Sequence, residues 1–363
     1  MKKGWEMKKL GEVCDVEYGT RVVHKRDGGS IYPVYGGGGA TFFMDTFNRE
    51  NCLIVARFAM SAQCTRFVSG KFFLNDSGLT IKPKNNKLLS PDFLNLHILF
   101  LNDIIYSIGR GTAQKNLDVS ALKNFEISYP KSLPEQKRIV ASLDKCFTAI
   151  DKAKVNAEQN LRNTKELFES YLQGVFEKKG EGWEEKKLRE CFKLKSGEML
   201  SSKMMKNGKI PVYGGNGISG YHIEFNLQGE NVIVGRVGAL CGNVRFVDEK
   251  IWLTDNAFLL TDYKYAFDKT FLTYLLNYKN LRNYARQAAQ PVISNSSLND
   301  VLILFPKPLQ EQQAIVRQLD TLRAETQKLE AVYQKKIADL EELKKSILQK
   351  AFAGELGNCL TRY

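Results

Sequence analysis

The sequence has few of the residues from which metal sites and disulfide frameworks are built. It contains three histidines, at positions 24, 97 and 222, and seven cysteines, none of which forms a C-x-x-C pair. A protein zinc site needs several such ligands at short, regular spacings, and a disulfide framework needs an even number of cysteines. We therefore expect no metal and no disulfide scaffold, and we expect the cysteines to be buried structural thiols.

Long hydrophobic runs are absent as well. The most apolar stretch, FLNLHILFLNDII at residues 93–105, is shorter than a membrane span and contains asparagine and aspartate. Residues 1–10 have no apolar segment of the kind found in secretory signal peptides. These two features favour a cytoplasmic protein without a membrane partner.

The sequence also lacks the motifs of the common nucleotide- and DNA-modifying enzymes. We find no Walker A motif G-x-x-x-x-G-K-[ST], no [DNS]-P-P-[YF] motif of base methyltransferases and no acidic nuclease cluster followed by E-x-K. One stretch, IPVYGGNGISG at residues 210–220, does fit the dinucleotide-binding pattern G-x-G-x-x-G. Apart from that stretch, these absences indicate a chain without catalytic residues and without a cofactor.

Positive charge is in excess, and it is concentrated in two segments. The formal net charge is +13. Residues 1–133 hold 18 basic and 12 acidic side chains, and residues 179–309 hold 18 and 13, whereas residues 134–178 and 310–363 are each balanced to within one charge. A localised basic excess is typical of a surface that binds a polyanion. It favours nucleic acid as a partner over a general contribution to solubility.

The sequence contains one long internal repeat. Four segments of the first half return in the same order in the second half, at an offset that varies only between 176 and 179 residues. GWEMKKLGEVCDVEYG returns as GWEEKKLRECFKLKSG, YPVYGGGG as IPVYGGNG, LIVARFAMSAQCTRFV as VIVGRVGALCGNVRFV, and ISYPKSLPEQKRIVASLD as ILFPKPLQEQQAIVRQLD. The period is too long for a solenoid. The repeat therefore predicts two similar domains related by an approximate two-fold axis.

Each repeat begins with about 130 residues that mix β-prone and helical segments. NCLIVAR, NVIVGR, GLTIKP and AFLLTD have the β-branched and apolar content of buried strands. Residues 90–105 and 268–285 have helical periodicity, with Ser90 and Asp268 as candidate N-caps. This mixture predicts an α+β domain.

Each repeat ends with a long helix. Over about 45 residues, apolar or small side chains recur at alternating spacings of three and four, which is typical of a coiled-coil seam. A helix of this length extends over roughly 65 Å. If the two helices are related by the two-fold axis, they pair as an antiparallel coiled coil; the alternative is that each helix packs on its own domain. The predicted seam positions are Ile139, Leu143, Cys146, Ile150, Ala153, Ala157, Leu161, Thr164, Phe168, Tyr171 and Val175, and Ile315, Leu319, Leu322, Thr326, Leu329, Tyr333, Ile337, Leu340, Leu343, Ile347 and Ala351.

Over nearly its full length, the chain resembles the specificity (S) subunit of type I restriction–modification enzymes. The resemblance rests on the two-fold repeat, the GW…KKL opening of each copy, the PVYGGxG turns and the IVxR strands. The P…L.EQ..IV..LD entry into each long helix, and the helix ends ESYLQGVFE and KSILQKAFAGEL, complete the pattern.

This resemblance implies a domain plan and a function. Residues 1–133 and 179–309 are then target-recognition domains, residues 134–178 and 310–354 are spacer helices, and residues 355–363 are a C-terminal tail. Such subunits read the two halves of a split site in double-stranded DNA, and their helices set the gap between the halves. They bind two modification (methyltransferase) subunits, which restriction (motor–nuclease) subunits join, and these partners carry the catalysis.

The residues leave two alternatives open. The first is the specificity arm of a related restriction–modification assembly that cuts next to its site. The second is an enzyme that binds a nucleotide in the glycine-rich stretch.

Candidate DNA-reading residues lie in both predicted domains. Arginine and lysine commonly contact guanine or phosphate, and asparagine and glutamine commonly contact adenine. The candidates in the first domain are Arg21, Lys25, Arg26, Arg57, Arg66, Arg110, Gln114 and Lys115, and those in the second are Lys203, Lys206, Asn207, Arg236, Arg245, Arg286, Gln287 and Gln290. GRGTAQKN at residues 109–116 and RQAAQPVISN at residues 286–295 occupy matching places before the last strand of each domain, and we expect loops there that reach into a groove.

Comparison of the two copies separates these candidates into two groups. Arg57 and Arg66 recur as Arg236 and Arg245. Domains that read different half-sites should differ where they contact bases, so shared arginines favour scaffold or phosphate contacts. The unlike stretches at residues 20–30 and 199–209 are the better candidates for base specificity.

The same comparison decides how the glycine-rich stretch is interpreted. Phe42 stands in the first copy where Gly220 stands in the second, so the dinucleotide spacing exists only once, and the copies share only PVYGG. A short aromatic segment follows in both copies, whereas a dinucleotide site needs a helix there. We therefore predict a duplicated structural turn near a DNA-facing edge.

Overall fold

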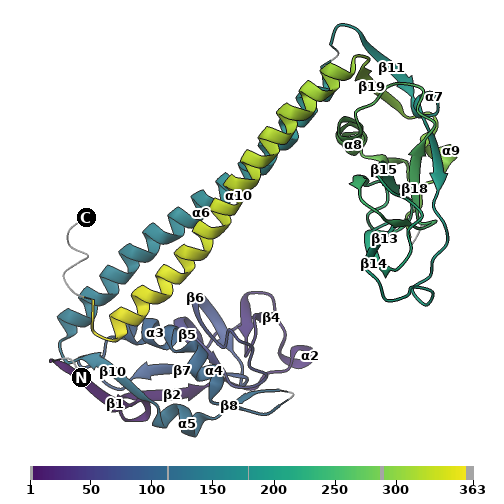
Figure 1. Cartoon of the computed structure of the whole chain (residues 1–363). Coiled ribbons are helices and arrows are strands. Elements are labelled where there is room, and N and C mark those ends of the chain that lie inside the picture. Colours follow the sequence, from purple (N-terminus) through teal and green to yellow (C-terminus); the bar gives the residue numbers. More distant parts are fainter. Residues whose placement is uncertain (1–2, 113, 179, 287–289, 357–363) are drawn as a thin grey trace. The chain divides into compact units, whose positions relative to one another are not determined.

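The computed structural model describes residues 3–112, 114–178, 180–286 and 290–356 and contains two compact units. Unit 1 consists of residues 1–158 and 335–363, and unit 2 consists of residues 159–334. Each unit contains one globular domain together with parts of the two long helices, α6 (Leu133–Glu177) and α10 (Leu309–Phe352) (Figure 1).

The domain of unit 1 is built on a six-stranded sheet in the order β2-β7-β5-β6-β3-β4. Neighbouring strands are antiparallel except β3 and β6, which are parallel. The strands are β2 (Cys14–Tyr18), β7 (Gly78–Pro83), β5 (Arg49–Ala56), β6 (Thr65–Leu74), β3 (Tyr32–Tyr35) and β4 (Ala40–Met44). Helix α3 (Pro91–Phe100) packs against β6 and β7, and α4 (Asn102–Ser107) follows it.

A second, two-stranded sheet leads into the long helix of unit 1. It pairs β1 (Trp5–Lys9) with β10 (Glu126–Pro130) in antiparallel orientation, and α6 begins three residues after β10 ends. The short elements of this domain are α1 (Leu10–Val13), α2 (His24–Asp27), α5 (Val119–Asn124), β8 (Gly109–Arg110) and β9 (Asn116–Leu117).

Unit 2 repeats this strand order with one break. Its sheets have the orders β12-β18-β15-β16 and β14-β13-β17. The strands are β12 (Lys193–Ser196), β18 (Ala257–Thr261), β15 (Glu230–Gly235), β16 (Val244–Asp248), β14 (Gly217–His222), β13 (Ile210–Gly214) and β17 (Trp252–Leu253). Since β16 and β17 together correspond to the single strand β6, one sheet of unit 1 becomes two in unit 2. The predicted pair of α+β domains is confirmed.

The remaining elements of unit 2 also have counterparts in unit 1. Strand β11 (Trp183–Lys187) pairs with β19 (Leu302–Pro306), which leads into α10, and α8 (Lys269–Tyr278) corresponds to α3. The short elements are α7 (Leu188–Cys191), the 3₁₀ helix η1 (Leu281–Tyr284) and α9 (Asn295–Leu298).

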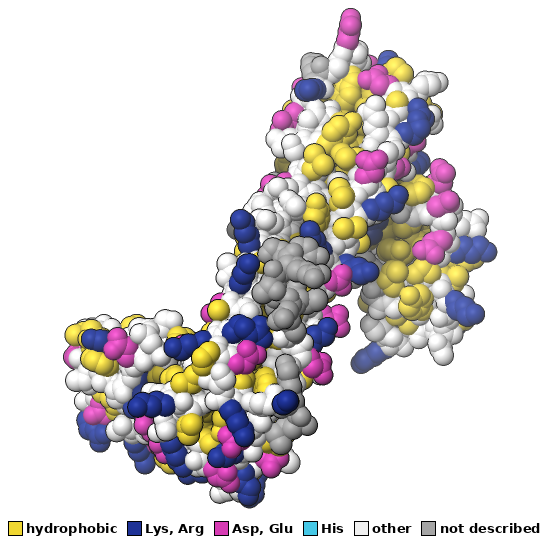
Figure 2. Space-filling view, turned by 90° about the vertical axis from the view of Figure 1, so that its left-hand side faces the viewer, with side chains coloured by type: hydrophobic (Ala, Val, Ile, Leu, Met, Phe, Trp, Pro, Cys, Tyr) yellow, Lys and Arg dark blue, Asp and Glu magenta, His cyan; other side chains and the backbone are white. Residues whose placement is uncertain are grey.

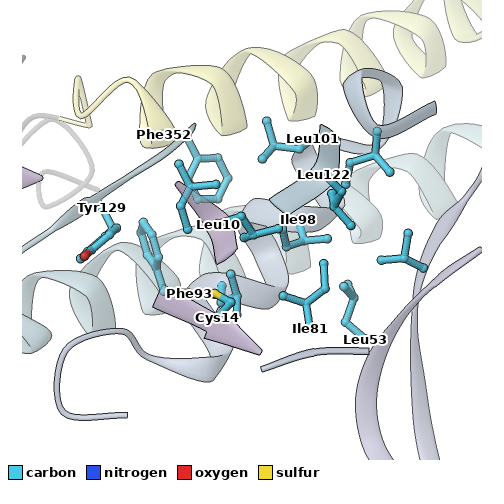
Figure 3. Packing of buried hydrophobic residues seen from close by; sticks show 14 of the residues in the cluster. Leu10, Cys14, Leu53, Ile81, Phe93, Ile98, Leu101, Leu122, Tyr129 and Phe352 are labelled. Atoms are coloured by element: carbon cyan, nitrogen blue, oxygen red, sulfur yellow. The ribbon is translucent and has the colours of Figure 1, made fainter. Parts of the chain in front are cut away.

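Each domain has a hydrophobic core between its helix and its sheet. In unit 1, Phe93 and Ile98 of α3 pack with Ile81 of β7 (Figure 3). In unit 2, Phe271 and Leu275 of α8 are buried in the corresponding cluster. Full burial of a side chain of this size contributes about 1.5–3 kcal/mol, so each cluster supplies a large part of the stability of its domain.

The end of a long helix is part of each core. Phe352 of α10 lies in the core of unit 1 (Figure 3). Its ring centroid is 4.3 Å from that of His97 and 5.2 Å from that of Phe100. Phe176 of α6 lies in the core of unit 2, 5.7 Å from the ring of Phe271 and 5.3 Å from that of Tyr278. Each domain therefore holds the beginning of one long helix and the end of the other.

The two long helices are antiparallel where they pair inside each unit. In unit 1, Lys344 contacts Asp151 at 3.0 Å and Glu341 contacts Lys154 at 2.6 Å, so the partner's number falls as the number along α6 rises. In unit 2, the Tyr171 hydroxyl donates to Gln318 Oε1 at 3.2 Å, and the guanidinium of Arg323 lies 5.7 Å from the ring of Phe168. The predicted antiparallel pairing is confirmed.

The predicted seam is only partly correct. Ala157, Thr164 and Thr326 are buried along it, but Tyr171, Leu329 and Leu343 are 40%, 43% and 47% exposed. The contact between two helices covers a narrow strip, and an apolar stripe wider than that strip leaves its borders in solvent. The prediction that every seam position is covered by the partner helix was therefore wrong for these three residues, although the Tyr171 hydroxyl still reaches α10.

The two candidate N-caps behave differently. Asp268 caps α8, because its Oδ1 accepts the backbone N–H of Phe271 at 2.9 Å. Ser90 occupies the N-cap position of α3, but its side chain makes no capping hydrogen bond. Its backbone N–H instead donates to Oε1 of Gln136 at 2.7 Å. The prediction is confirmed for Asp268 and holds for Ser90 in position only.

The six cysteines in the described residues are free thiols. Cys14, Cys64, Cys191 and Cys241 are buried, and burial raises the pKa of Cys14 to about 12 and that of Cys64 to about 11. Cys14 and Cys64 therefore remain protonated at neutral pH, and the four buried cysteines pack as small apolar side chains. Cys359 lies outside the described residues.

Buried His97 makes the stability of unit 1 depend on pH. Its side chain is 4% exposed, and burial lowers its pKa from 6.5 to about 4. Between these values the unfolded chain binds a proton that the folded unit excludes, so stability is greatest above pH 6.5 and falls as the pH falls toward 4. We expect His97 to contribute a loss of about 3 kcal/mol over this range.

Urea unfolding of the full chain at pH 7 and pH 5, compared with His97→Phe, measures this contribution. The variant keeps a ring against Phe352 but has no group that titrates. We expect the transition of unit 1 to lose less stability at pH 5 in the variant than in the parent chain. An equal loss in both proteins contradicts the assignment to His97.

Candidate nucleic-acid interface

The shared glycines form a hairpin turn in each domain. The turn joins β3 to β4 in unit 1 and β13 to β14 in unit 2. A Cβ atom on Gly37 would lie 2.5 Å from the carbonyl oxygen of Phe58, and one on Gly215 would overlap the carbonyl oxygen of Val237. Only glycine fits these close backbone approaches. A strand follows the turn in both copies, so the predicted structural turn is confirmed and the dinucleotide geometry is absent from these described segments.

An arginine lies beside each glycine turn. A Cβ on Gly217 would lie 3.5 Å from Nη2 of Arg245, and one on Gly39 would lie 4.0 Å from Nη1 of Arg66. Nη1 of Arg245 is buried and has no hydrogen-bond partner among the described residues, and burial lowers the pKa of this guanidinium. Each domain therefore has a guanidinium next to its glycine turn, and in unit 2 part of that guanidinium is buried without a partner in the described residues.

Arg245 also opens onto a cavity of about 440 Å³ in unit 2. Arg323 and Asp320 of α10 also line this cavity. The guanidinium of Arg323 lies 5.6 Å from the ring of Tyr274, and Asp320 accepts a hydrogen bond from the Tyr274 hydroxyl at 2.7 Å. The other lining residues are Tyr213, Phe246, Val247, Thr270, Thr273 and Asn277.

The second pair of shared arginines supports the backbone of its own domain. Arg57 donates to the carbonyl oxygen of Asp76 at 3.3 Å, and Arg236 donates to that of Asp255 at 3.4 Å. The guanidinium of Arg57 lies 4.4 Å from the ring of Phe58. Both arginines are half-buried, so these contacts favour a scaffold role for the pair.

The loops before the last strand of each domain dock onto the backbone next to these arginines. The N–H of Leu117 donates to the carbonyl oxygen of Arg57 at 2.8 Å, and the N–H of Ile293 donates to that of Arg236 at 2.9 Å. Ala59 and Gly238 follow Arg57 and Arg236 by two residues. Both have left-handed backbones, with φ of 46° and 103°. The loop positions of the two domains are therefore equivalent.

The candidate residues on these loops have different surroundings. Arg110 and Gln114 are exposed, and Arg110 forms an ion pair with Asp118. Nζ of Lys115 lies 4.3 Å from the ring of Tyr106. Arg286 and Gln290 are exposed, and Gln287 lies outside the described residues.

The unlike stretches lie on the second strand of each glycine hairpin. In unit 1, the ring of His24 lies 4.9 Å from that of Phe42, and the N–H of Gly29 donates to the carbonyl oxygen of Phe43 at 2.7 Å. In unit 2, the N–H of Lys206 donates to Nδ1 of His222 at 3.0 Å. The structure thus brings the unlike stretch, the glycine turn and its arginine into one region of each domain.

The charged candidates on these stretches are exposed. Arg21, Lys25, Lys203 and Asn207 have exposed side chains, as do Arg26 and Lys206. Arg26 pairs with Asp27 at 2.9 Å, and Lys206 lies 3.8 Å from Glu224. Figure 2 shows one face of unit 1 in its lower part. On this face, Lys and Arg side chains are spread among acidic and hydrophobic ones.

A polar cavity of about 460 Å³ lies at this region of unit 2. It is lined by residues of all three segments that meet there: the stretch 199–209, the glycine turn and the loop 286–295. The polar lining residues are Ser201, Ser202, Asn216, Ser219, Thr254, Asn256 and Gln290. Amides and hydroxyls of this kind form hydrogen bonds with base edges and phosphates.

Sequence reasoning missed a set of amide side chains that recur in both copies. Asn102 Oδ1 accepts the N–H of Thr65 and Asn277 Oδ1 accepts that of Val244, each at 3.0 Å, which fixes the strand position just before Arg66 and Arg245. Asn48 and Asn226 each form two hydrogen bonds with the backbone of one strand residue, and Gln136 and Gln312 are buried at the helix starts. Their recurrence in both copies was the available signal.

The described ranges offer no site for a metal ion and no membrane-spanning helix. No group of three or more His, Cys, Asp or Glu side chains in these ranges is arranged to hold a metal. No helix in them is both long and apolar enough to cross a membrane.

Comparison with known proteins agrees with this architecture. The family model "Type I restriction modification DNA specificity domain" matches residues 2–160 and 180–339. The chain is 30% identical over 224 residues to the type I restriction enzyme EcoprrI specificity subunit of Escherichia coli, a match that covers 57% of this chain and 55% of that subunit. It is 24% identical over 349 residues to a putative type I specificity subunit of Mycoplasma genitalium, covering 88% and 86% of the two chains. The chain thus spans about half the length of the first of these relatives.

Solved structures share the fold. The HsdS subunit of Thermoanaerobacter tengcongensis has a TM-score of 0.62 at 21% identity, and the match covers 98% of both chains. A chain from a study of complex assembly and conformational transition of the type I restriction–modification system has a TM-score of 0.80 at 19% identity, covering 98% of this chain and 99% of the other. Since the family model covers two copies and most of the sequence, the chain belongs to the type I restriction–modification DNA specificity family.

Proposed function

We propose that this chain is the non-catalytic subunit that reads a bipartite DNA site for a type I restriction–modification complex. Residues 1–133 and 179–309 each read one half-site, and the helices at 134–178 and 310–354 set the unspecific gap. Two modification subunits dock on the chain, and restriction subunits join them. Methylation and cleavage take place in these partners.

One observation carries this proposal: the two domains share a frame and differ in the segments that lie on it. The glycine turn, the arginine beside it and the asparagine that bonds to the strand backbone recur, whereas residues 20–30 and 199–209 are unlike and contact equivalent strands. Two readers built in this way recognise different sequences from one architecture. The distance between them then fixes half-site separation.

The charges support the same division. The basic excess is located in the two domains, and the long helices are nearly balanced. Neutralised phosphates supply affinity and register without reading sequence, and a balanced helical surface is suited to protein partners. We assign phosphate contact to Arg66 and Arg245, and base reading to the unlike stretches and the loops 109–116 and 286–295.

Methylation mapping in cells that carry this chain and its modification subunit tests the proposal as a whole. The expected result is a single motif made of two short blocks separated by a constant number of unspecified bases. A continuous motif contradicts the bipartite reading. Methylation that stays unchanged when the gene for this chain is deleted contradicts its role in specificity.

Substitutions in the unlike stretches should change one half-site each. Lys203→Ala with Asn207→Ala removes exposed polar groups of unit 2, and the loss of one base contact costs about 1–3 kcal/mol of discrimination. We expect a reduced preference for the correct base in one half-site only, measured by binding of the complex with modification subunits to oligonucleotides varied in that half-site. Arg21→Ala with Lys25→Ala is the matched pair in unit 1 and should affect the other half-site. If both pairs affect the same half-site, the assignment is wrong.

Lengthening a helix should lengthen the gap. Four residues inserted after Ala157 add about 6 Å to α6, or one to two base-pair rises of about 3.4 Å. Ala157 is buried in the seam, which already contains the four-residue steps Ala153–Ala157–Leu161, so the added turn keeps an apolar face toward α10. We expect methylated sites with unchanged half-sites and a longer gap. Altered half-sites would contradict the division between readers and spacer.

A further inference from the structure

We propose that Gln136 and Gln312 are positioning residues that lock each recognition domain to the long helix that leaves it, and so restrict the DNA gap to one length. This inference rests on the proposed function. It concerns the rigidity of the two domain–helix joints, which neither the helix length nor the reading segments determine.

In unit 1 the amide of Gln136 joins three separate segments. Its Oε1 accepts the N–H of Ser90 at 2.7 Å, and its Nε2 donates to the carbonyl oxygens of Leu88 at 2.8 Å and Pro130 at 2.7 Å. Gln136 lies in the first turn of α6 and has no exposed surface. The end of β10, the loop before α3 and the helix start therefore meet at one side chain.

Unit 2 repeats this contact with the same geometry. Oε1 of Gln312 accepts the N–H of Asp268 at 2.9 Å, and Nε2 donates to the carbonyl oxygens of Ala266 at 3.1 Å and Pro306 at 2.9 Å. Gln312 is also fully buried, in the first turn of α10. Each amide uses both of its donors and one of its acceptor positions.

These contacts make a rigid joint and not only a stable one. Two residues separate β10 from α6, and two separate β19 from α10, so the chain has no flexible linker there. A rotation of the helix start would break three hydrogen bonds together and leave buried polar groups unpaired. Further along the same side of the helices, Ile139 lies one turn and Leu143 two turns beyond Gln136, and Leu319 lies two turns beyond Gln312; all three are buried.

The other helix of the pair is held in the same domain. In unit 1 the carbonyl oxygen of Phe352, at the end of α10, accepts the Ser128 hydroxyl at 3.3 Å, and the Phe352 ring stacks on His97. In unit 2 Phe176 at the end of α6 packs against Phe271. Each domain is thus attached to both helices, and the glutamine adds three hydrogen bonds to that attachment.

Small changes at such a joint are amplified along the helix. A tilt of about 10° at one end of a half-helix of about 34 Å moves its other end by about 6 Å, which exceeds one base-pair rise of about 3.4 Å. Selection of one gap length therefore needs rigid junctions between each domain and its helix, as well as rigid helices.

The test measures the methylation rate of the assembled complex on DNA duplexes with fixed half-sites and a gap changed in steps of one base pair. The variants are Gln312→Met and Gln136→Met, which keep the side-chain volume and remove the hydrogen bonds; Gln312→Asn, one methylene shorter, is the milder change. For the parent chain we expect one preferred gap. For the variants we expect the preference over the adjacent gap lengths to fall about tenfold, with both half-sites unchanged.

Val232→Ala is the control for a general loss of stability. Val232 is fully buried in unit 2 and is not among the residues that contact Gln312, so this variant should weaken the unit and keep the gap preference. Equal relaxation by Val232→Ala would overturn the proposal, as would glutamine variants that assemble and keep the parent preference. A parent chain that accepts many gaps would instead contradict the proposed function itself, so the two failures are distinguishable.

Discussion

A glutamine without exposed surface, at the start of each long helix, is the contact on which the two units depend. A buried amide that loses a partner costs about 1–3 kcal/mol, so Gln136 and Gln312 are stable only where all three backbone partners are present. That condition brings an edge strand, a loop and a helical turn to one point. Folding of each domain and docking of its helix are consequently coupled.

Amide-to-backbone hydrogen bonds also hold the region of the candidate interface in place. Asn102 and Asn277 each fix the strand residue that precedes an arginine, and the glycine turn fits against a neighbouring carbonyl oxygen that leaves no room for a side chain. Arg57 and Arg236 are occupied with backbone oxygens. The frame therefore holds Arg66 and Arg245 in equivalent places, while the stretches on the hairpins are free to differ.

The sequence contains enough information for the repeat, the α+β domains and the paired helices, because hydrophobic period and motif order survive in both copies. It does not reveal how much of an apolar stripe one partner helix covers, which is why Tyr171, Leu329 and Leu343 were placed in the seam. Gln136 belongs to the L.EQ motif, but its burial was not predicted, because a glutamine between Glu135 and Lys137 is typical of an exposed helix start. The contacts of Arg57 with the carbonyl oxygen of Asp76 and the ring of Phe58, and the left-handed backbone of Ala59, depend on tertiary packing and could not be predicted from the local sequence.

The two copies can differ in sequence and still fold alike because of the atoms to which the recurring amide side chains bond. These amides form hydrogen bonds with backbone atoms. Every residue type has those atoms, except that proline lacks the N–H. Gln136 contacts the backbone of Leu88 and Ser90, and Gln312 contacts that of Ala266 and Asp268, so the side chains at these two positions have changed without loss of the contact. Amides that bond only to backbone atoms place little restriction on the neighbouring side chains. Under the proposed function, the unlike stretches can therefore be replaced while the joint between each domain and its helix stays the same.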